Sequence, residues 1–383
     1  MNQSQSYKKF IYSFIAFFFL FPAALAFFNY QVDPNHRYRF SISEPSLRHF
    51  SESGNLVLTL PENYDDRILL KKFIRVIDPP SAVVLGGSRV LNIQPEMLKS
   101  SYRESFLNAG IAKGTIRDYI AFWQLIKETG HKPEVVFLGV EQQSLNSVSQ
   151  NHFYLSVLEY YEAFFQKDLS LRVKFMGVAT DFKDLLSLQT TLASFDKIFN
   201  KPPEATRLIH RDELEGNQAA RTSSFSFLYP PSYASKSLAF LNNQGNQNGR
   251  GEVRVFEMWN PSDRRGYNQL AALIQDIKKA GARPIIVGMP YHPEAFRVIS
   301  ENSEARKNLI LFVDELKRLA AAENVTFYDG IISSRSSFEA QDFIDGVHLD
   351  VQPSYELFFE ASSLFGKQFF EESFPRELRQ RKA

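Results

Sequence analysis

The stretch Val83-Val84-Leu85-Gly86-Gly87-Ser88-Arg89 decides how the fold of this chain is interpreted. Its first three residues are apolar and mostly β-branched, which predicts a short buried strand at about 82–87. The two glycines allow the backbone to turn sharply where that strand ends. Ser88 is therefore expected at the carboxyl edge of an open α/β sheet, where such folds bind their ligands.

Segments on both sides of this stretch alternate between helix and strand patterns. Helices are predicted at about 66–76, 114–130, 267–280 and 303–323, and strands at 82–87, 134–140, 284–289 and 325–328. Strands joined by crossover helices at such short spacing indicate a parallel sheet. The predicted fold class is α/β, with a central parallel sheet in one domain over residues 66–370.

A second short segment, Asp345-Gly346-Val347-His348, supplies the groups that a serine nucleophile needs. A serine hydroxyl reacts poorly at neutral pH unless a base lies within hydrogen-bond reach and a third group orients that base. His348 can be the base and Asp345 the orienting group, because residues three apart in a helical turn project from the same side. The sequence thus predicts a site of Ser88, Asp345 and His348, although each motif taken alone also fits an ordinary turn.

These segments resemble sequence blocks of the SGNH/GDSL hydrolase superfamily. The serine turn is similar to block one, the late Asp-x-x-His to block five, and Asn108-Ala109-Gly110-Ile111, followed by Gly114-Thr115, to block two. The likeness covers roughly residues 80–150 and 265–365 and is one of pattern. Within the superfamily it is closest to membrane-anchored, extracytoplasmic members that act in teichoic acid D-alanylation and alginate O-acetylation.

The resemblance implies a three-layer, flavodoxin-like domain with assigned residue roles. Ser88 would be the nucleophile, His348 the base and Asp345 its partner. The backbone N–H of Gly110, beside Asn108, would be an oxyanion donor. No cofactor is expected, and the scattered histidines predict no metal site.

The third block of the resembled family is altered in this chain. The family pattern is Gly-x-Asn-Asp, whose asparagine donates to the oxyanion, whereas this chain has Gly139-Val140-Glu141-Gln142. An ionised Glu141 cannot donate a hydrogen bond. Gln142, Gln143 or Arg89 could supply the missing donor, and the sequence does not choose among them. Alternatively, Glu141 caps a strand and Arg89 pairs with a structural carboxylate.

Residues 10–28 form an uncharged, Phe-rich run of 19 residues that follows Lys8-Lys9. This length suits a membrane-spanning helix, which needs about 20 residues. The lysines predict that residues 1–9 stay in the cytoplasm and that everything after residue 29 lies outside. Ala24-Leu25-Ala26 also fits a signal-peptidase site, and both interpretations give the same compartment. With the resemblance, this indicates a single-pass protein of a bacterial inner membrane, with its domain in the periplasm or extracytoplasmic space.

Three further segments complete the predicted organisation. They are a membrane-proximal connection at 29–65, an insertion at 150–260 and a charged tail at 371–383. Within the insertion, helical apolar spacing predicts packed helices at the start, and the Asn-, Gln- and Gly-rich part at 212–251 is interpreted as long loops. An insertion at this edge of a sheet is expected to form a lid or a substrate surface.

Composition narrows the functional classes. The chain has 383 residues, a net charge of +1 and no cysteine. Without a basic stripe or a nucleic-acid motif, no nucleic-acid partner is expected. Without cysteine, thiol nucleophiles and cysteine-based metal sites are excluded, and an exported domain must be held together by its core.

The expected function is that of a membrane-anchored serine O-acyltransferase or esterase. It would act on an acyl ester of a cell-surface or exported polysaccharide through an acyl-serine intermediate, and the resemblance implies a multi-pass membrane acyltransferase as a possible partner. The residues do not distinguish transfer from hydrolysis. The alternative is a non-catalytic carbohydrate-binding or assembly protein that kept the fold.

Overall fold

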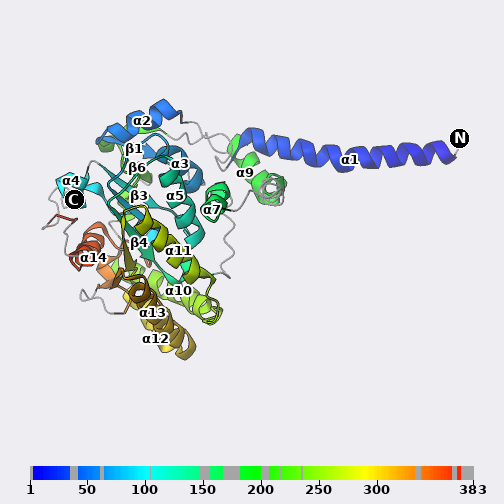
Figure 1. Ribbon diagram of the computed structural model, residues 1–383. Coiled ribbons are helices and arrows are strands. Elements are labelled where there is room, and N and C mark those ends of the chain that lie inside the picture. The colour runs from blue at the N-terminus through cyan, green and yellow to red at the C-terminus, as the bar shows by residue number, and fades with distance from the viewer. Residues whose placement is uncertain are drawn as a thin grey trace.

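A computed structural model of the chain places a mixed α/β body at one end of a long projecting helix, α1 (Gln3–Val32) (Figure 1). The structure describes residues 3–34, 42–60, 64–103, 105–146, 156–166, 182–199, 207–214, 218–233, 236–332, 338–364 and 369–371. The predicted charged tail lies outside these residues, apart from its first one.

The body is built around a five-stranded sheet, and each strand pairs in parallel with its neighbours. The strand order is β3-β2-β4-β8-β9. The strands are β2 (Ala82–Gly86), β3 (Phe106–Gly110), β4 (Val135–Val140), β8 (Arg283–Gly288) and β9 (Thr326–Asp329). If these five strands are numbered 1 to 5 along the chain, their order in the sheet is 2-1-3-4-5, which is a doubly wound order. The chain first adds a strand on one side of β2 and then adds the other three on the opposite side. The predicted α/β class and parallel sheet are confirmed.

Helices and apolar side chains cover both faces of this sheet. One face packs against α3 (Asp66–Ile74), α5 (Ile116–Glu128), α11 (Arg265–Lys279) and α13 (Ser303–Glu323). The other packs against α14 (Val351–Ser363) and Phe369-Phe370. Because side chains alternate along a strand, Val83 and Leu85 belong to the first core and Val84 to the second. All four predicted helices are present, with ends within three residues of expectation.

A second sheet adjoins the domain and was not predicted. It is antiparallel, in the order β5-β1-β6-β7. Its strands are β1 (Leu56–Thr59), β5 (Leu208–His210), β6 (Ala220–Thr222) and β7 (Phe227–Leu228), and helix α2 (Glu44–Glu52) precedes it. The segment interpreted as a membrane-proximal connection therefore contributes a helix and a central strand. These strands hold only two to four residues each, which is too short for an alternation pattern to stand out.

Residues 238–257 form helix α10 (Leu238–Glu257), where the composition had predicted loops. Two glycines explain the difference, because they let α10 approach α12 (Pro293–Glu301) closely. A Cβ on Gly245 would lie 2.2 Å from Nδ1 of His292, and one on Gly249 would lie 2.8 Å from Cα of Ala295. Tertiary packing thus overrides the weak helix propensity of this segment.

The remaining described helices are short. They are α4 (Ser100–Arg103), α6 (Gln142–Leu145), α7 (Leu158–Phe164), α9 (Leu188–Phe199) and the 3-10 turns Ser88–Val90, Pro95–Met97, Arg211–Glu213, Pro231–Tyr233 and Ala340–Asp342. Helices α7 and α9 lie in the part of the insertion where helical packing was predicted.

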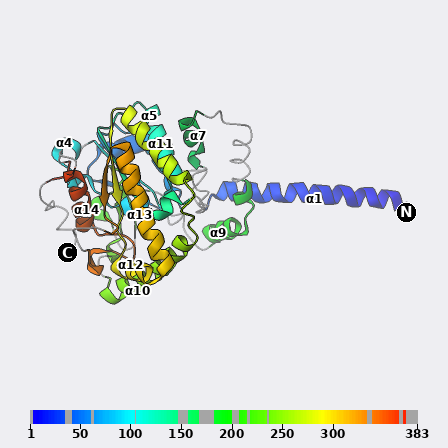
Figure 2. The ribbon, with the colours of Figure 1, turned by 60° about the horizontal axis from the view of Figure 1, so that its bottom comes forward.

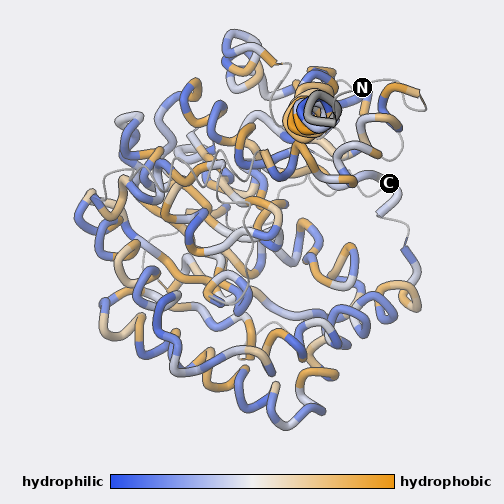
Figure 3. The backbone as a smooth tube through the Cα atoms, turned by 90° about the vertical axis from the view of Figure 1, so that its right-hand side faces the viewer, coloured by the Kyte–Doolittle hydropathy of each residue, from blue (hydrophilic) through white to orange (hydrophobic). Residues whose placement is uncertain are grey.

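Helix α1 is the one helix in the described residues that is long and apolar enough to cross a membrane. An 18-residue window within Tyr7–Val32 has a mean hydropathy of 2.2, and most of the large apolar side chains of this stretch are exposed. Figure 3 looks along α1, which projects from the domain toward the viewer, whereas the hydrophobic strands lie inside the body. By length and composition, α1 fits the predicted span.

Candidate functional site

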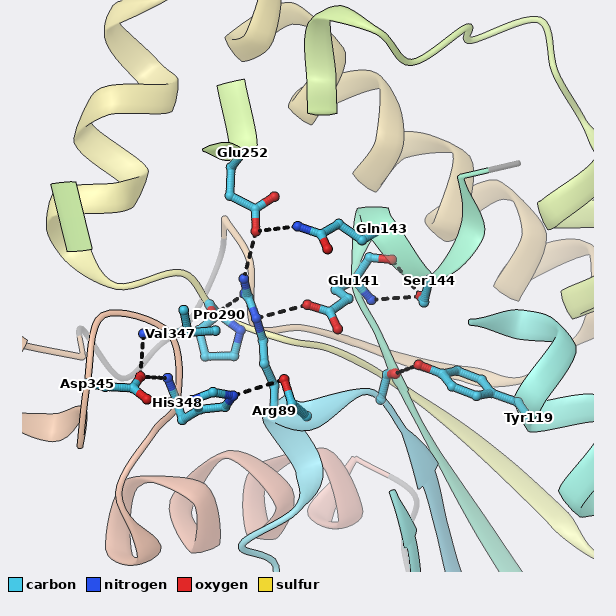
Figure 4. Close-up of polar contacts among 12 residues, drawn as sticks. Arg89, Tyr119, Glu141, Gln143, Ser144, Glu252, Pro290, Asp345, Val347 and His348 are labelled. Carbon is cyan, nitrogen blue, oxygen red and sulfur yellow. Dashed lines mark hydrogen bonds and ion pairs between the residues drawn. The ribbon is translucent and has the colours of Figure 1, made fainter. Parts of the chain in front are cut away.

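The structure brings Ser88, His348 and Asp345 together at the carboxyl edge of the parallel sheet. Figure 4 shows the Asp345 and His348 side chains next to each other. Oγ of Ser88 lies 2.9 Å from Nε2 of His348, and Nδ1 of the same ring lies 2.8 Å from Oδ2 of Asp345. Each ring nitrogen is thus engaged by a different partner. With Nδ1 donating to the carboxylate, Nε2 is left as the acceptor for the serine proton, which is the arrangement that activates a serine.

The loop that carries Asp345 and His348 is a closed turn rather than the helical turn expected from the sequence. Phe343 and Leu349 form an antiparallel bridge across it, and the backbone N–H of Ile344 donates to the carbonyl of His348 at 2.9 Å. Within the turn, Oδ1 of Asp345 accepts the backbone N–H groups of residues 347 and 348 at 2.7 and 2.8 Å. One carboxylate oxygen therefore fixes the loop while the other orients the imidazole.

The same contacts keep the Asp345 carboxylate ionised. Burial alone would raise its pKa, but the hydrogen bonds and charge of His348, together with the two backbone N–H groups, lower the pKa below its ordinary value. An ionised carboxylate next to Nδ1 stabilises the imidazolium that forms when Nε2 takes a proton.

The turn that presents Ser88 is held by glycine contacts at three strand ends. A Cβ on Gly86, Gly110 or Gly139 would lie 2.3–2.6 Å from a methyl group of Val90, so the isopropyl group fits only where all three lack a side chain. None of these glycines has a positive φ. Close approach, rather than an unusual backbone angle, is therefore the reason for glycine in the serine motif.

Asn108 holds the chain that follows Ser88. Its Nδ2 donates to the carbonyls of Val90, Leu91 and Ile93 at 2.8–3.1 Å, and its Oδ1 accepts the N–H of Gly110 at 2.9 Å. The residues predicted to contact an oxyanion thus bond to each other and to the serine turn. The Gly110 N–H is not free for an oxyanion in this conformation.

Arg89 turns away from Ser88 into the protein and is 5 % exposed. It forms ion pairs with Glu141 at 2.9 Å and Glu252 at 3.1 Å and donates to the carbonyl of Pro290 at 2.8 Å (Figure 4). Its guanidinium also lies over the ring of Tyr291. The structure therefore favours the alternative in which Arg89 pairs with structural carboxylates, and Glu141 and Glu252 already hold the cation that was considered as an oxyanion donor.

This cluster contains two carboxylates for one guanidinium. Burial raises the pKa of Glu252, and the charge of Arg89 only partly offsets this effect. The pKa of Arg89 is raised by Glu141 and Glu252 even though burial opposes it. The guanidinium is therefore charged, and burial favours the protonated form of Glu252.

The other candidate donors differ in their surroundings. Nε2 of Gln143 donates to Glu252 at 3.1 Å. Gln142 is buried, and its side-chain amide has no hydrogen-bond partner in the described part of the chain. The backbone N–H of Ser88 is also unbonded among the described residues and belongs to the nucleophile itself. An N–H at this position can donate to the oxyanion that forms on a substrate carbonyl oxygen when Oγ attacks the carbonyl carbon.

Two features beside the triad were not predicted. The ring of Tyr229 lies 5.6 Å from the imidazole of His348, centroid to centroid. A pocket of about 680 Å³ opens next to it, and its wall includes Asp345. The lining residues are Pro230, Ser232, Tyr233, Lys236, Phe240, Gln244, Asn248, Asp345 and Val347. The sequence Tyr-Pro-Pro at 229–231 favours an ordered turn, but the polar composition around it indicated a long loop.

Among the described residues, no group of three or more histidine, aspartate and glutamate side chains is arranged to hold a metal ion. His292 caps α12, because its Nδ1 accepts the backbone N–H of Glu294 at 3.1 Å. In comparisons with known proteins, no family model and no curated protein matches this chain.

Proposed function

We propose that this chain is an SGNH-like serine O-acyltransferase or esterase, anchored in the membrane by α1. The observation that carries the proposal is the continuous series of hydrogen bonds from Ser88 Oγ through His348 to Asp345. A series of hydrogen bonds of this kind activates a serine hydroxyl. It is unusual around a partly exposed serine that has no role in catalysis.

The proposed reaction has two balanced steps. In the first, Oγ of Ser88 attacks an ester carbonyl while Nε2 of His348 takes the hydroxyl proton, and His348 then gives that proton to the departing alcohol. The product is an acyl ester on Ser88. In the second, His348 takes a proton from an acceptor hydroxyl or a water, the acyl group moves to that oxygen, and the proton returns to Ser88.

The pocket beside the triad supports a saccharide as the acyl acceptor or donor. The rings of Tyr233 and Phe240 give it flat apolar surfaces, while the side-chain amides of Gln244 and Asn248 make no hydrogen bond with other described residues. Both amides lie four residues apart on α10 and face the same side. Aromatic faces combined with free amides suit a ligand that has C–H faces and many hydroxyl groups.

The anchor supports a substrate or partner at a membrane. Lys8-Lys9 before the apolar run would keep the amino terminus in the cytoplasm and put the domain on the other side. We place the protein in a bacterial inner membrane with the domain facing the periplasm or extracytoplasmic space, acting on an envelope polysaccharide. A multi-pass membrane acyltransferase is the proposed source of acyl groups.

Reaction of the purified full chain with a fluorophosphonate probe in detergent tests the proposal. Such probes form a stable bond only with an activated serine. We expect the wild-type chain to be labelled and Ser88→Ala and His348→Ala to lose labelling while keeping their thermal unfolding temperature. Ser262→Ala and His49→Ala, at exposed positions far from the motif in sequence, are the matched controls and should label like the wild type.

The outcomes separate the two functional classes. Labelling that needs both Ser88 and His348 supports an enzyme and directs attention to donor and acceptor. A folded wild-type chain that is never labelled would overturn the serine mechanism and favour a glycan-binding or assembly protein.

A further inference from the structure

Helix α9 (Leu188–Phe199) has the reverse of the usual distribution of polar and apolar side chains. Its buried residues are the small polar ones, Thr190, Thr191 and Ser194. Its large apolar residues are 47–74 % exposed, and they are Leu188, Leu192, Phe195, Ile198 and Phe199. A helix on a water-facing domain surface normally buries its apolar stripe. The exposed face of α9 therefore suits an apolar surrounding.

The polar face of α9 is buried because it packs against the last turns of α1. Nδ2 of Asn29 donates to Oγ1 of Thr191 at 2.9 Å, and the ring of Phe28 lies 5.2 Å from that of Phe195. Nζ of Lys197 donates to the carbonyl of Asp33 at 3.0 Å. In both Figure 1 and Figure 2, α9 lies beside the end of α1 that joins the body.

The position of the α9 contacts along α1 indicates how deep α9 would lie in a bilayer that surrounds α1. The Phe-rich apolar run of α1 ends at Phe28, and its 19 residues span roughly the 30 Å hydrocarbon thickness of a bilayer at about 1.5 Å per residue. The ring and hydrogen-bond contacts with α9 lie at Phe28, Asn29 and Asp33, at the end of that run and just beyond it. A membrane that surrounds α1 would therefore have its headgroup region at the level of α9.

We propose that α9 is an interfacial membrane helix that lies on the bilayer beside α1, with Leu188, Leu192, Phe195 and Phe199 inserted into lipid. These four residues follow the i, i+4, i+7, i+11 spacing of one helix face. The apolar face of such a helix sits at the boundary between headgroups and acyl chains. Two contacts with the membrane, one spanning and one lying flat, fix the height and tilt of the domain above it. This inference concerns orientation and goes beyond the proposed chemistry.

The absence of cysteine from the chain allows a direct test by single-site labelling. Nitroxide labels are placed at Leu192→Cys and, separately, Phe199→Cys in the full chain. The matched control is Ile310→Cys on α13, an apolar residue that is also partly exposed, at 44 %. Each variant is reconstituted at one copy per lipid nanodisc, and circular dichroism confirms its helix content. Collision rates with oxygen, which concentrates in lipid, and with a water-soluble nickel chelate are then measured.

We expect the labels at 192 and 199 to collide mainly with oxygen and the label at 310 mainly with the nickel chelate. Water-like accessibility at both α9 positions would overturn the proposal. Low accessibility to both reagents would also overturn it, because it would show that protein covers this face, and one copy per disc excludes a second copy as the source. Ser88→Ala in the same background should leave these rates unchanged, so the result does not depend on the proposed reaction.

Discussion

Ser88 and Arg89 are adjacent in sequence, yet the structure gives them opposite surroundings. Ser88 is partly exposed, and among the described residues its side chain has one hydrogen-bond partner, Nε2 of His348. Arg89 is buried, and its guanidinium is held by Glu141, Glu252 and a backbone carbonyl. One turn thus contributes both an accessible group suited to chemistry and a buried group suited to holding the turn in place.

The difference shows how a rigid site can contain a loosely bonded hydroxyl. A nucleophile needs free lone pairs and access to substrate, so its own contacts cannot hold it firmly. The buried cluster supplies that rigidity one residue away. Glu141 connects the two regions, because its Oε1 lies only 2.3 Å from where a Cβ on Gly87 would be. We therefore expect changes on the Ser88 side to affect reactivity and changes on the Arg89 side to affect stability.

The largest expected effect is that of Asp345→Asn on reactivity. The asparagine oxygen can still accept the backbone N–H groups of residues 347 and 348, which leaves its NH₂ group facing Nδ1 of His348. The imidazole must then carry its proton on Nε2, where it cannot take one from Ser88. The rate of fluorophosphonate labelling should fall by about 10⁴-fold. The unfolding temperature should stay unchanged, which would show that the variant is folded and that the loss concerns reactivity.

Asp342→Asn, three residues earlier in the same segment, provides the control for a charge change near the loop. Its carboxylate accepts the backbone N–H of Glu339 and has no contact with His348. If Asp345→Asn labels as fast as this control, Asp345 has no role in orienting the base.

The second prediction concerns stability and uses Arg89→Met. Removal of the guanidinium leaves Glu141 and Glu252 as unpaired buried carboxylates, and breaking a buried ion pair from one side costs about 3–5 kcal/mol. Denaturant unfolding of the full chain in detergent measures this loss. Arg297→Met removes an exposed arginine that pairs on α12 with a half-buried and an exposed glutamate, and it should change stability by less than about 1 kcal/mol. Equal effects of the two substitutions would show that the buried cluster does not hold the turn.

The third prediction tests the contact that joins the two regions, through Gly87→Ala. The added methyl group would push Oε1 of Glu141 away from its present position, and overpacking of this kind costs about 1–3 kcal/mol. Because Ser88 is the next residue, labelling should slow as well. Gly251→Ala on α10 meets no atom within 4 Å and should stabilise the chain by about 0.5–1 kcal/mol, so the two alanines are expected to have opposite signs.

The sequence predicted the parts of the molecule that depend on local patterns. The buried strand before Ser88, the crossover helices and the long apolar helix all follow from periodicity over one segment. It also predicted that Ser88, Asp345 and His348 belong to one site, because the late Asp-x-x-His supplies the base and the orienting group that a serine nucleophile needs. Arg89 was left with two interpretations, since its carboxylate partners lie 52 and 163 residues away in sequence.

Features that depend on long-range packing could not be predicted. The second sheet joins strands that are each too short to show a pattern, and its central strand β1 pairs with residues about 150 positions later. Helix α10 forms because Gly245 and Gly249 fit against α12, which its own composition does not show. The pocket beside the triad is lined by α10 and by the segment that follows β7, so it could not be predicted before these parts were placed.

The smallest expected effect is that of Glu252→Gln on the pH dependence of stability. Burial raises the pKa of Glu252 in the folded chain above the ordinary value of about 4.3, so the folded state holds this proton more tightly than the unfolded state does. Its contribution to stability is therefore fully present below that ordinary value and is lost as the pH rises through the folded pKa. The amide that replaces the carboxyl group cannot titrate, and its oxygen can still accept a hydrogen bond from Arg89.

The unfolding temperature of Glu252→Gln relative to the wild type should accordingly rise between pH 4 and pH 7, by no more than a few degrees. Glu301→Gln, whose partner Arg297 is exposed, corrects for the general effect of removing one negative charge. A relative unfolding temperature that falls over the same range would mean that attraction between Glu252 and Arg89 outweighs burial. The cluster would then hold two ionised carboxylates around Arg89. In that case Glu252→Gln should destabilise the serine turn, because it removes a charge that attracts Arg89.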